Sequence, residues 1–207
     1  MDVANPISCL APSTHGPVLA VLAGATEPLT GRKIAELTRP RVSASQVATT
    51  LRDLTEQGLV ASTPAGRSKL YVLNRSHVAA PVVAAAVRLR QELWDRIVAH
   101  VRGWQHPAVG VVVFGSTARG DGDRRSDIDL LVVRPDVVED ERWQQDLADL
   151  AEAVLTWSGN PCEILDRSAG DLAQMAAARE RLLTEIRRDG RVLLGSRSLV
   201  PPPAVGA

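Results

Sequence analysis

The chain has little cysteine, lysine and aromatic side chain, and it has no long apolar run. Its two cysteines, Cys9 and Cys162, are too few for a disulfide framework and lack the spacing of a zinc site. The four histidines are scattered, which argues against a metal site built on imidazole. No apolar stretch reaches the roughly 18 residues that a membrane span needs, and the N-terminus lacks the pattern of a signal peptide. We therefore expect a soluble, cytoplasmic protein.

Charge is balanced over the 207 residues but not along the chain. The 24 basic and 24 acidic residues give a formal net charge of zero. Eight basic and five acidic side chains lie in the first 75 residues, so this part has a net charge of +3 and the remainder −3. A basic segment beside an acidic one indicates a nucleic-acid partner for the former. The only lysines are Lys33 and Lys69, so cationic chemistry further along must use arginine.

Three helices are expected in the first third of the chain. The first is a short apolar helix over residues 16–24. The second follows Thr30, a good N-cap residue, and the third covers residues 43–57, where Ser43 or Ser45 can cap it.

A β-hairpin is expected directly after these helices. Gly58 suits the position that ends the third helix, whose apolar stripe consists of Val47, Leu51 and Leu54. Two short strands follow, 59–63 and 69–74, around a turn rich in Pro and Gly. From about Gly16 to Arg75, this layout resembles the winged helix-turn-helix modules of bacterial transcription regulators.

The resemblance implies that the third helix enters the major groove of DNA. Its polar face offers Ser45, Gln46, Thr49, Thr50 and Arg52. Arg67 and Lys69, at the tip of the wing, are expected to reach phosphates. The alternative is that the module mediates homodimerisation or contacts a partner protein.

A long helix is expected over residues 80–104, between the winged helix and the rest of the chain. Its apolar positions repeat near helical spacing: Val83, Val87, Leu93, Ile97 and Val101. Trp94 and Trp104 are interpreted as core anchors. The expected division is a winged helix over 1–78, a connecting helix over 79–106, a second domain over 107–198 and a disordered tail over 199–207.

Two aspartates lie in an otherwise apolar stretch of the second domain. Residues 109–114 read as a buried strand that ends at Gly115-Ser116, where backbone N–H groups and a hydroxyl can approach a phosphate. Asp127 and Asp129 are two residues apart, so on a strand both project to one face while Ile128 points into the core. Like charges at this spacing repel, and magnesium, which prefers oxygen ligands, relieves the repulsion. A solvated strand end is the alternative.

The segment GSTARGDGDRRSDIDLLV resembles the signature of the DNA polymerase β-like nucleotidyltransferase superfamily. It is most similar to the minimal bacterial type, Gly-Ser-x-Ala-Arg-Gly followed by Ser-Asp-x-Asp-Leu, and the resemblance runs from about Ala108 to Gly195. The family places a third carboxylate on a later strand, and Glu163 in NPCEILD fits its apolar setting. Asp166 is the competitor, which we expect to lie beyond that strand. A helix over 138–157 and a closing helix and strand over 178–195 complete the expected α/β (α+β) fold, with a small mixed sheet.

The resemblance implies transfer of a nucleoside monophosphate from a nucleoside triphosphate, ATP in the first instance, to an acceptor hydroxyl. Two Mg²⁺ or Mn²⁺ ions would be held by Asp127, Asp129 and Glu163. The nucleotide-binding residues would be Gly115, Ser116, Arg119 and Ser126, and either Arg124 or Arg125 is an alternative to Arg119 for the phosphate charge. Arg119 alternatively braces its own loop by an ion pair.

The resemblance also bears on partners. Minimal nucleotidyltransferases often act with a separate helical protein in toxin–antitoxin pairs and adenylylate it, so a protein or RNA acceptor is expected beside the nucleotide. A second interpretation remains open at this point. In it, the chain is a transcription regulator whose C-terminal domain only senses nucleotides or mediates assembly.

Overall fold

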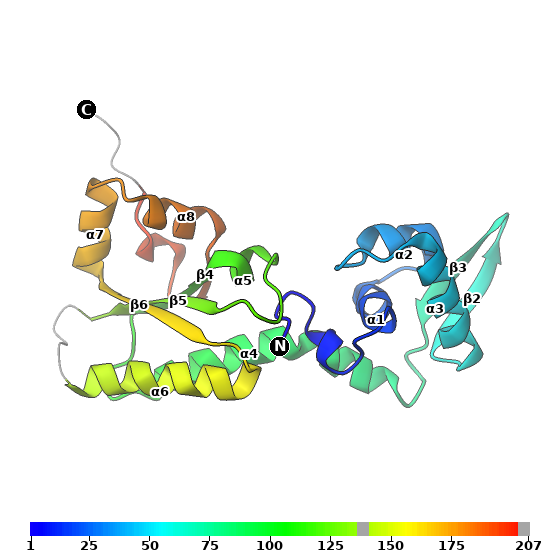
Figure 1. Ribbon diagram of the computed structural model, residues 1–207, viewed down its shortest axis with the longest axis horizontal. Coiled ribbons are helices and arrows are strands. Elements are labelled where there is room, and N and C mark those ends of the chain that lie inside the picture. The colour runs from blue at the N-terminus through cyan, green and yellow to red at the C-terminus, as the bar shows by residue number, and fades with distance from the viewer. Residues whose placement is uncertain (136–140, 203–207) are drawn as a thin grey trace. The chain divides into compact units, whose positions relative to one another are not determined.

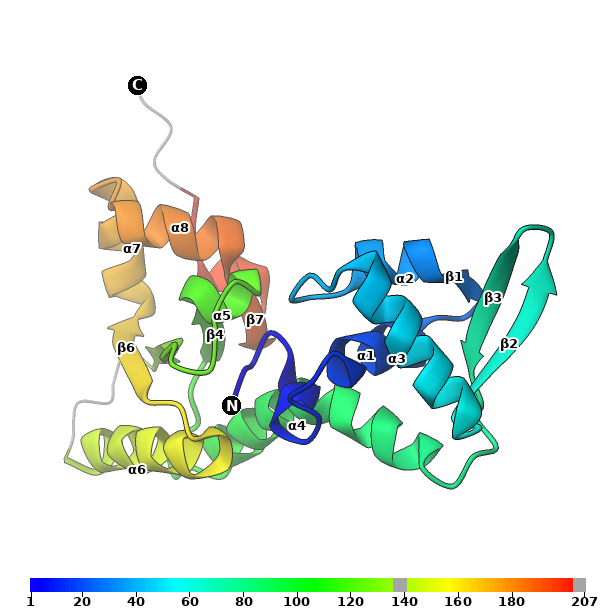
Figure 2. The ribbon, with the colours of Figure 1, turned by 45° about the vertical axis from the view of Figure 1, so that its right-hand side comes forward.

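The computed structural model describes residues 1–135 and 141–202 of the chain. They form two compact units, whose boundary falls between Arg90 and Gln91, inside one long helix, α4 (Ala80–Arg102). Figures 1 and 2 show the two units. Met1 and Val3 group with the second unit, and Asp2 and residues 4–90 form the first.

The N-terminal unit combines short helices with a three-stranded antiparallel sheet in the order β1-β3-β2. In chain order its elements before α4 are η1 (Pro6–Cys9), α1 (His15–Gly24), β1 (Leu29–Thr30), α2 (Gly31–Leu37), α3 (Ala44–Glu56), β2 (Val60–Ala65) and β3 (Ser68–Leu73). The helices and the hairpin follow one another in the order that the sequence predicts.

Capping residues set the limits of the helices in this unit. The Thr30 hydroxyl accepts a hydrogen bond from the Lys33 backbone N–H and starts α2. Ser43, rather than Ser45, caps α3 in a capping box with Gln46. After α3, Gly58 has φ +77°, a left-handed conformation that costs glycine little.

The apolar stripe of α3 lies in the core of the N-terminal unit, as predicted. Val47, Leu51 and Leu54 are all buried there. The prediction for Thr50 was wrong, because this side chain is buried and shares a hydrogen bond of 2.7 Å with the Thr14 hydroxyl. Thr50 follows Val47 by three residues and precedes Leu54 by four, which places it on the inner side of the helix.

The C-terminal unit contains a four-stranded mixed sheet in the order β6-β5-β4-β7. The β5–β6 pair is parallel, and the other two pairs are antiparallel. After the second half of α4 come β4 (Gly110–Phe114), α5 (Gly115–Arg119), β5 (Ile128–Arg134), α6 (Glu141–Ser158), β6 (Cys162–Ser168), α7 (Ala169–Ala177), α8 (Arg181–Asp189), β7 (Arg191–Leu194) and η2 (Arg197–Leu199). The mixed α+β fold and the small mixed sheet agree with the sequence prediction.

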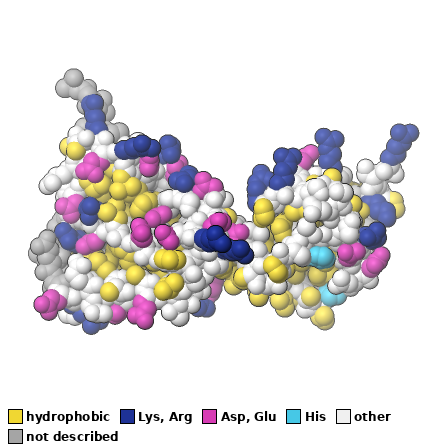
Figure 3. Space-filling model, in the orientation of Figure 1, with side chains coloured by type: hydrophobic (Ala, Val, Ile, Leu, Met, Phe, Trp, Pro, Cys, Tyr) yellow, Lys and Arg dark blue, Asp and Glu magenta, His cyan; other side chains and the backbone are white. Residues whose placement is uncertain are grey.

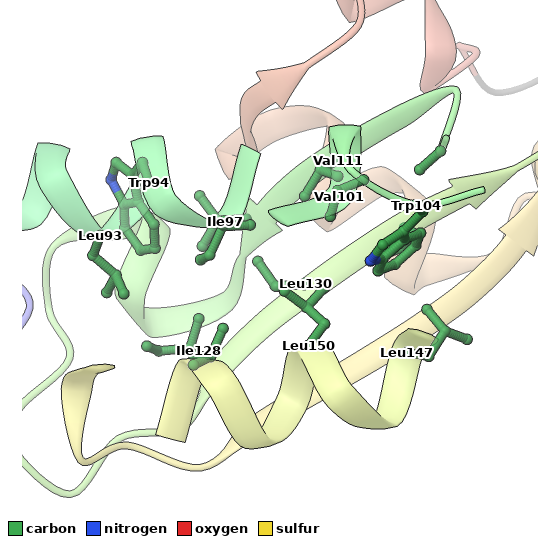
Figure 4. Packing of buried hydrophobic residues seen from close by; sticks show 14 of the residues in the cluster. Leu93, Trp94, Ile97, Val101, Trp104, Val111, Ile128, Leu130, Leu147 and Leu150 are labelled. Atoms are coloured by element: carbon green, nitrogen blue, oxygen red, sulfur yellow. The ribbon is translucent and has the colours of Figure 1, made fainter. Parts of the chain in front are cut away.

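Helices cover both faces of this sheet (Figure 1). On one face, α4 and α6 pack against alternate residues of β5 such as Ile128 and Leu130 (Figure 4). On the other face, α7 and α8 pack against Leu131 and Val133. Alternation of side chains along a strand therefore sends Ile128 into one core and Asp129 toward the opposite side.

The tryptophans belong to the core between the sheet and α4 and α6. Trp94 and Trp104 are buried, and Trp104 meets Trp143 edge to face with ring centroids 5.1 Å apart. Both therefore act as core anchors, as the sequence indicates.

The predicted ends of two segments need correction. The helix predicted over 138–157 is described from Glu141 to Ser158, and its first three predicted residues lie outside the described part. The tail was predicted to be disordered from residue 199, but Leu199 ends η2 and Val200 is buried beside α7 and α8. An apolar side chain there covers the sheet, while residues 203–207 lie outside the described part. None of the described helices is long and apolar enough to cross a membrane.

Candidate active site

Two acidic residues are neighbours on adjacent parallel strands. Asp129, the second residue of β5, is the Cα partner of Glu163, the second residue of β6. Residues paired in this way point to the same side of a sheet. The fold therefore joins two carboxylates that are 34 positions apart in the sequence, and Asp127 lies just before β5.

The pKa of the Asp129 carboxyl is raised, first by its partial burial and then by the negative charges of Glu163 and Asp127. Arg119 acts in the opposite direction and lowers it. The three acids are thus close enough to repel one another, and an added cation at this point would relieve the repulsion.

Gly115 makes room for the Asp129 carboxylate. Its φ is +68°, and a β-carbon at this position would collide with the carboxylate oxygen and carbon of Asp129. The sequence predicts that the Gly115 backbone approaches a phosphate. The structure shows a further reason for glycine here, because there is no space for a side chain beside the Asp129 carboxylate. Phe114 pairs with Asp129 in the antiparallel β4–β5 pair, so Gly115, the next residue, lies beside Asp129.

The loop from Ser116 to Asp127 is held by its own hydrogen bonds. The Ser116 carbonyl accepts N–H groups from Gly120, Asp121 and Gly122 at 3.0 to 3.2 Å. The Thr117 hydroxyl donates to the Asp127 carbonyl at 3.0 Å, so the loop is fastened to the start of β5. These bonds fix the backbone on which Ser116 and Asp127 stand.

Ser126 is one of the predicted nucleotide-binding residues, and it braces this loop. Its hydroxyl accepts the Asp123 backbone N–H at 2.8 Å and donates to the Asp123 carboxylate at 3.3 Å. The Asn160 side chain donates to the Ser126 carbonyl at 2.9 Å. Ser126 therefore holds the loop in shape from a position near Asp127.

Arginine side chains border the acids. Arg119 forms an ion pair with Asp121 at 3.2 Å, the bracing role that the sequence left open. This pair is largely solvent-exposed, so its contribution to stability is small and it can be exchanged for another anion. Arg124 and Arg125 are exposed and form no side-chain ion pair with the described residues.

A pocket of about 310 Å³ opens beside the two paired acids. Its lining residues are Phe114, Asp129, Glu163, Ile164, Leu165 and Leu182. Phe114 and Leu182 were not among the predicted site residues. Leu182 is 38% exposed although it is large and apolar, and it comes from α8, which is remote in the sequence. One wall of the pocket is thus carboxylate and the other apolar.

The competing third acid, Asp166, lies on β6 and not beyond it, so that expectation was wrong. It is separated from Glu163 by three positions, which turns it to the opposite face of the sheet. There its carboxylate pairs with Arg134 at 3.2 Å. Asp166 is therefore a partner of Arg134, and only Glu163 shares the face of Asp129.

The acids at this site offer oxygen donors, the kind that Mg²⁺ prefers. No group of three or more His, Cys, Asp or Glu is arranged as a metal site within residues 1–135 and 141–202. Burial raises the pKa of the neighbouring Cys162 thiol to about 12, with added effects from Asp129 and Glu163. The thiol thus stays protonated at neutral pH and is a poor ligand. The donor set fits a hard cation.

The match to a protein family covers this site. Residues 97–181 match the nucleotidyltransferase domain family. This range includes Gly115, Asp127, Asp129 and Glu163 and ends just before Leu182. The match spans less than half of the chain, and no curated protein matches the chain.

Three solved structures are similar to parts of the chain. A toxin–antitoxin crystal structure with AMP-PNP is 21% identical over 52% of this chain and 79% of that one, with a TM-score of 0.39. A Shewanella oneidensis complex of tri-AMPylated HEPN toxin with MNT antitoxin is 18% identical over 52% and 73%, with a TM-score of 0.35. TrmBL2, an archaeal chromatin protein, is 14% identical over 89% and 77%, with a TM-score of 0.31.

Proposed function

We propose that the C-terminal unit transfers a nucleoside monophosphate, in the first instance from ATP, to an acceptor hydroxyl. The observation that carries this proposal is the pairing of Asp129 with Glu163 on parallel strands, over the glycine that follows β4. The match of residues 97–181 to the nucleotidyltransferase domain family supports the same reaction class.

Asp127, Asp129 and Glu163 would hold Mg²⁺, which supplies positive charge to the triphosphate and to the attacking oxygen. Bound in this way, the three carboxylates no longer repel one another. The Mg²⁺ dependence is part of the proposal, because carboxylate oxygens are the ligands that Mg²⁺ prefers.

Ser116 and Arg119 would bind the triphosphate. The Ser116 hydroxyl forms no hydrogen bond with the described residues, while its carbonyl is fixed by the loop. Arg119 lies near enough to Asp129 to lower its pKa, and its exposed pair with Asp121 can be exchanged for phosphate oxygens. Gly115, which has no side chain, keeps the backbone close to the Asp129 carboxylate.

Transfer then needs a base for the acceptor hydroxyl. Glu163 is exposed, so an acceptor can reach it, and its carboxylate takes the hydroxyl proton as the oxygen attacks the α-phosphorus. The bond from the α-phosphorus to the bridging oxygen breaks, and pyrophosphate leaves. A general base usually contributes about a hundredfold or more.

The proposed acceptor is a hydroxyl on a separate helical protein, in a toxin–antitoxin pair. This part follows from the sequence resemblance, and the exposed position of Glu163 is compatible with a macromolecular acceptor. The test is incubation of the chain and the protein encoded beside it with α-labelled nucleoside triphosphates and Mg²⁺. Label on the partner supports transfer. Nucleotide binding without label on any acceptor would favour the sensor interpretation.

We also propose that the N-terminal unit binds DNA through α3 and the β2–β3 hairpin. Ser45, Gln46, Thr49 and Arg52 are all exposed on α3. Arg67 and Lys69 are exposed at the hairpin tip, and a groove of about 550 Å³ lies between the hairpin and the N-terminal ends of α2 and α3.

The charge on this surface supports phosphate contacts. Figure 3 shows Lys and Arg side chains along one rim of the N-terminal unit and at the hairpin tip. Arg32, which the sequence reading did not single out, lines the same groove as Arg67 and Lys69. Gel shifts with DNA from upstream of the chain's own gene test the proposal. Absence of binding at low salt would leave this unit as a protein-interaction module.

A further inference from the structure

The N-terminal unit contains a pocket beside α1, and none of the residues predicted to bind DNA lines it. Its volume is about 540 Å³, within the range of about 300 to 1,000 Å³ that holds small organic ligands. It lies among η1, α1, the end of α2 and α4, and every lining residue belongs to this unit. Most of the lining is apolar, as at Ile7, Val21 and Leu37.

Asn5 contributes a mostly buried polar side chain to this lining. Asn5 is only 6% exposed, and it precedes η1 without forming a side-chain capping bond. Its backbone N–H bonds to Asp2, but its carboxamide forms no hydrogen bond within the described ranges. The Asn5 carboxamide is therefore available to a polar group of a ligand in the pocket.

The charged groups at the pocket are mostly cationic. Arg39 and Arg90 line it, against a single acid, the exposed Glu27. Arg39 uses one guanidinium nitrogen on the Glu36 and Thr38 carbonyls, which leaves its other nitrogens available. Arg90 is half-buried and forms no ion pair or hydrogen bond with the described residues. The pocket thus combines an apolar body with unpaired positive charge.

We propose that this pocket binds a small apolar molecule that carries one carboxylate. The apolar body of the ligand packs on η1, α1 and α4, and its carboxylate accepts the paired N–H groups of Arg90. A guanidinium matches the planar carboxylate in two parallel hydrogen bonds, and it tolerates partial burial better than an ammonium group. The Asn5 carboxamide donates a further hydrogen bond to the same carboxylate. Binding here is independent of nucleotidyl transfer.

The test uses 8-anilino-1-naphthalenesulfonate, a fluorescent apolar anion, bound to the full chain and displaced by decanoate or by decan-1-ol. We expect saturable binding at one site. Because a hydrogen-bonded charge is worth about tenfold or more in affinity, decanoate should displace the probe at least about tenfold better than the alcohol. Arg90→Gln should lower the affinity for decanoate by a similar factor.

Arg88→Gln is the matched control, since Arg88 is exposed on the same helix and does not line the pocket. It should leave both displacement curves unchanged. Asn5→Ala removes the carboxamide without a change in charge. The affinity of this variant for decanoate is the second measure, and its melting temperature shows that the unit stays folded. Three results would each overturn the proposal: no saturable binding, equal displacement by acid and alcohol, or the same effect from Arg90→Gln and Arg88→Gln.

Discussion

Asp129 on β5 and Glu163 on β6 are direct Cα partners in a parallel register. Parallel strands need a crossover, here α6, so the two carboxylates meet only after the chain has covered one face of the sheet. Partial burial, followed by the negative charges of Glu163 and Asp127, raises the pKa of the Asp129 carboxyl. Such a pair is unfavourable for the protein alone and favourable once a cation binds, and this difference underlies the first predictions.

Replacing both aspartates, Asp127→Asn with Asp129→Asn, should strongly weaken binding of Mg²⁺ with nucleotide while the fold survives. The substitution removes like charges that repel in the folded protein, so the melting temperature should stay the same or rise. Affinity for Mg²⁺ with a non-hydrolysable ATP analogue, measured by calorimetry, should fall more than about tenfold because carboxylate ligands are lost. Unchanged affinity would remove these residues from the site.

Glu163→Gln should keep nucleotide binding but lower transfer about a hundredfold or more, because the proton acceptor is lost. The matched control is Asp166→Asn on the same strand, which faces the other side of the sheet and pairs with Arg134. That change should lower stability more than transfer. Rates with labelled nucleotide and the partner protein decide between the two, and equal losses would show that the third acid is misassigned.

Gly115→Ala should disturb the site more than Gly120→Ala, although both glycines have positive φ. A β-carbon added at Gly115 would meet the Asp129 carboxylate. A β-carbon added at Gly120 would have no atom within 4 Å. Both changes should cost about 1 kcal/mol or more in unfolding free energy from backbone strain. Only Gly115→Ala should also weaken nucleotide binding, and similar binding by the two variants would contradict the steric account.

DNA binding by the N-terminal unit should weaken steeply with salt. Contacts from Arg67 and Lys69 release counterions from the phosphates, so the double change to Gln should reduce the slope of log affinity against log salt by about 2. Fluorescence anisotropy at several salt concentrations measures the slope. Arg88→Gln, away from α3 and the hairpin, is the control, and an equal change in its slope would show that only overall charge matters.

Neighbouring threonines of α3 should separate stability from DNA contact. Thr50→Val removes the hydrogen bond to Thr14 and should lower the unfolding free energy by about 1 kcal/mol. Thr49→Val, at an exposed position, should leave stability nearly unchanged and weaken DNA binding. Urea unfolding measures the stability, and fluorescence anisotropy measures the DNA affinity. A larger loss of stability from Thr49→Val than from Thr50→Val would contradict the burial of Thr50.

The sequence alone determined the elements that depend on neighbours along the chain. The Thr30 cap, the left-handed Gly58 and the stripe of Val47, Leu51 and Leu54 follow from local hydrogen bonding and helical period. The alternation that buries Ile128 and frees Asp129 is equally local. Such features need no knowledge of what packs against them.

Only the tertiary structure decided which distant residues share a site. The resemblance indicates Glu163, but only the register of β5 with β6 places it directly opposite Asp129, while Asp166 lies opposite Val132. Leu182 enters the pocket from α8, and no nearby sequence pattern points to it. Thr14, from a distant part of the chain, supplies the hydrogen-bond partner of the buried Thr50 hydroxyl. Packing between segments far apart in the chain sets these three outcomes, and local periodicity does not encode it.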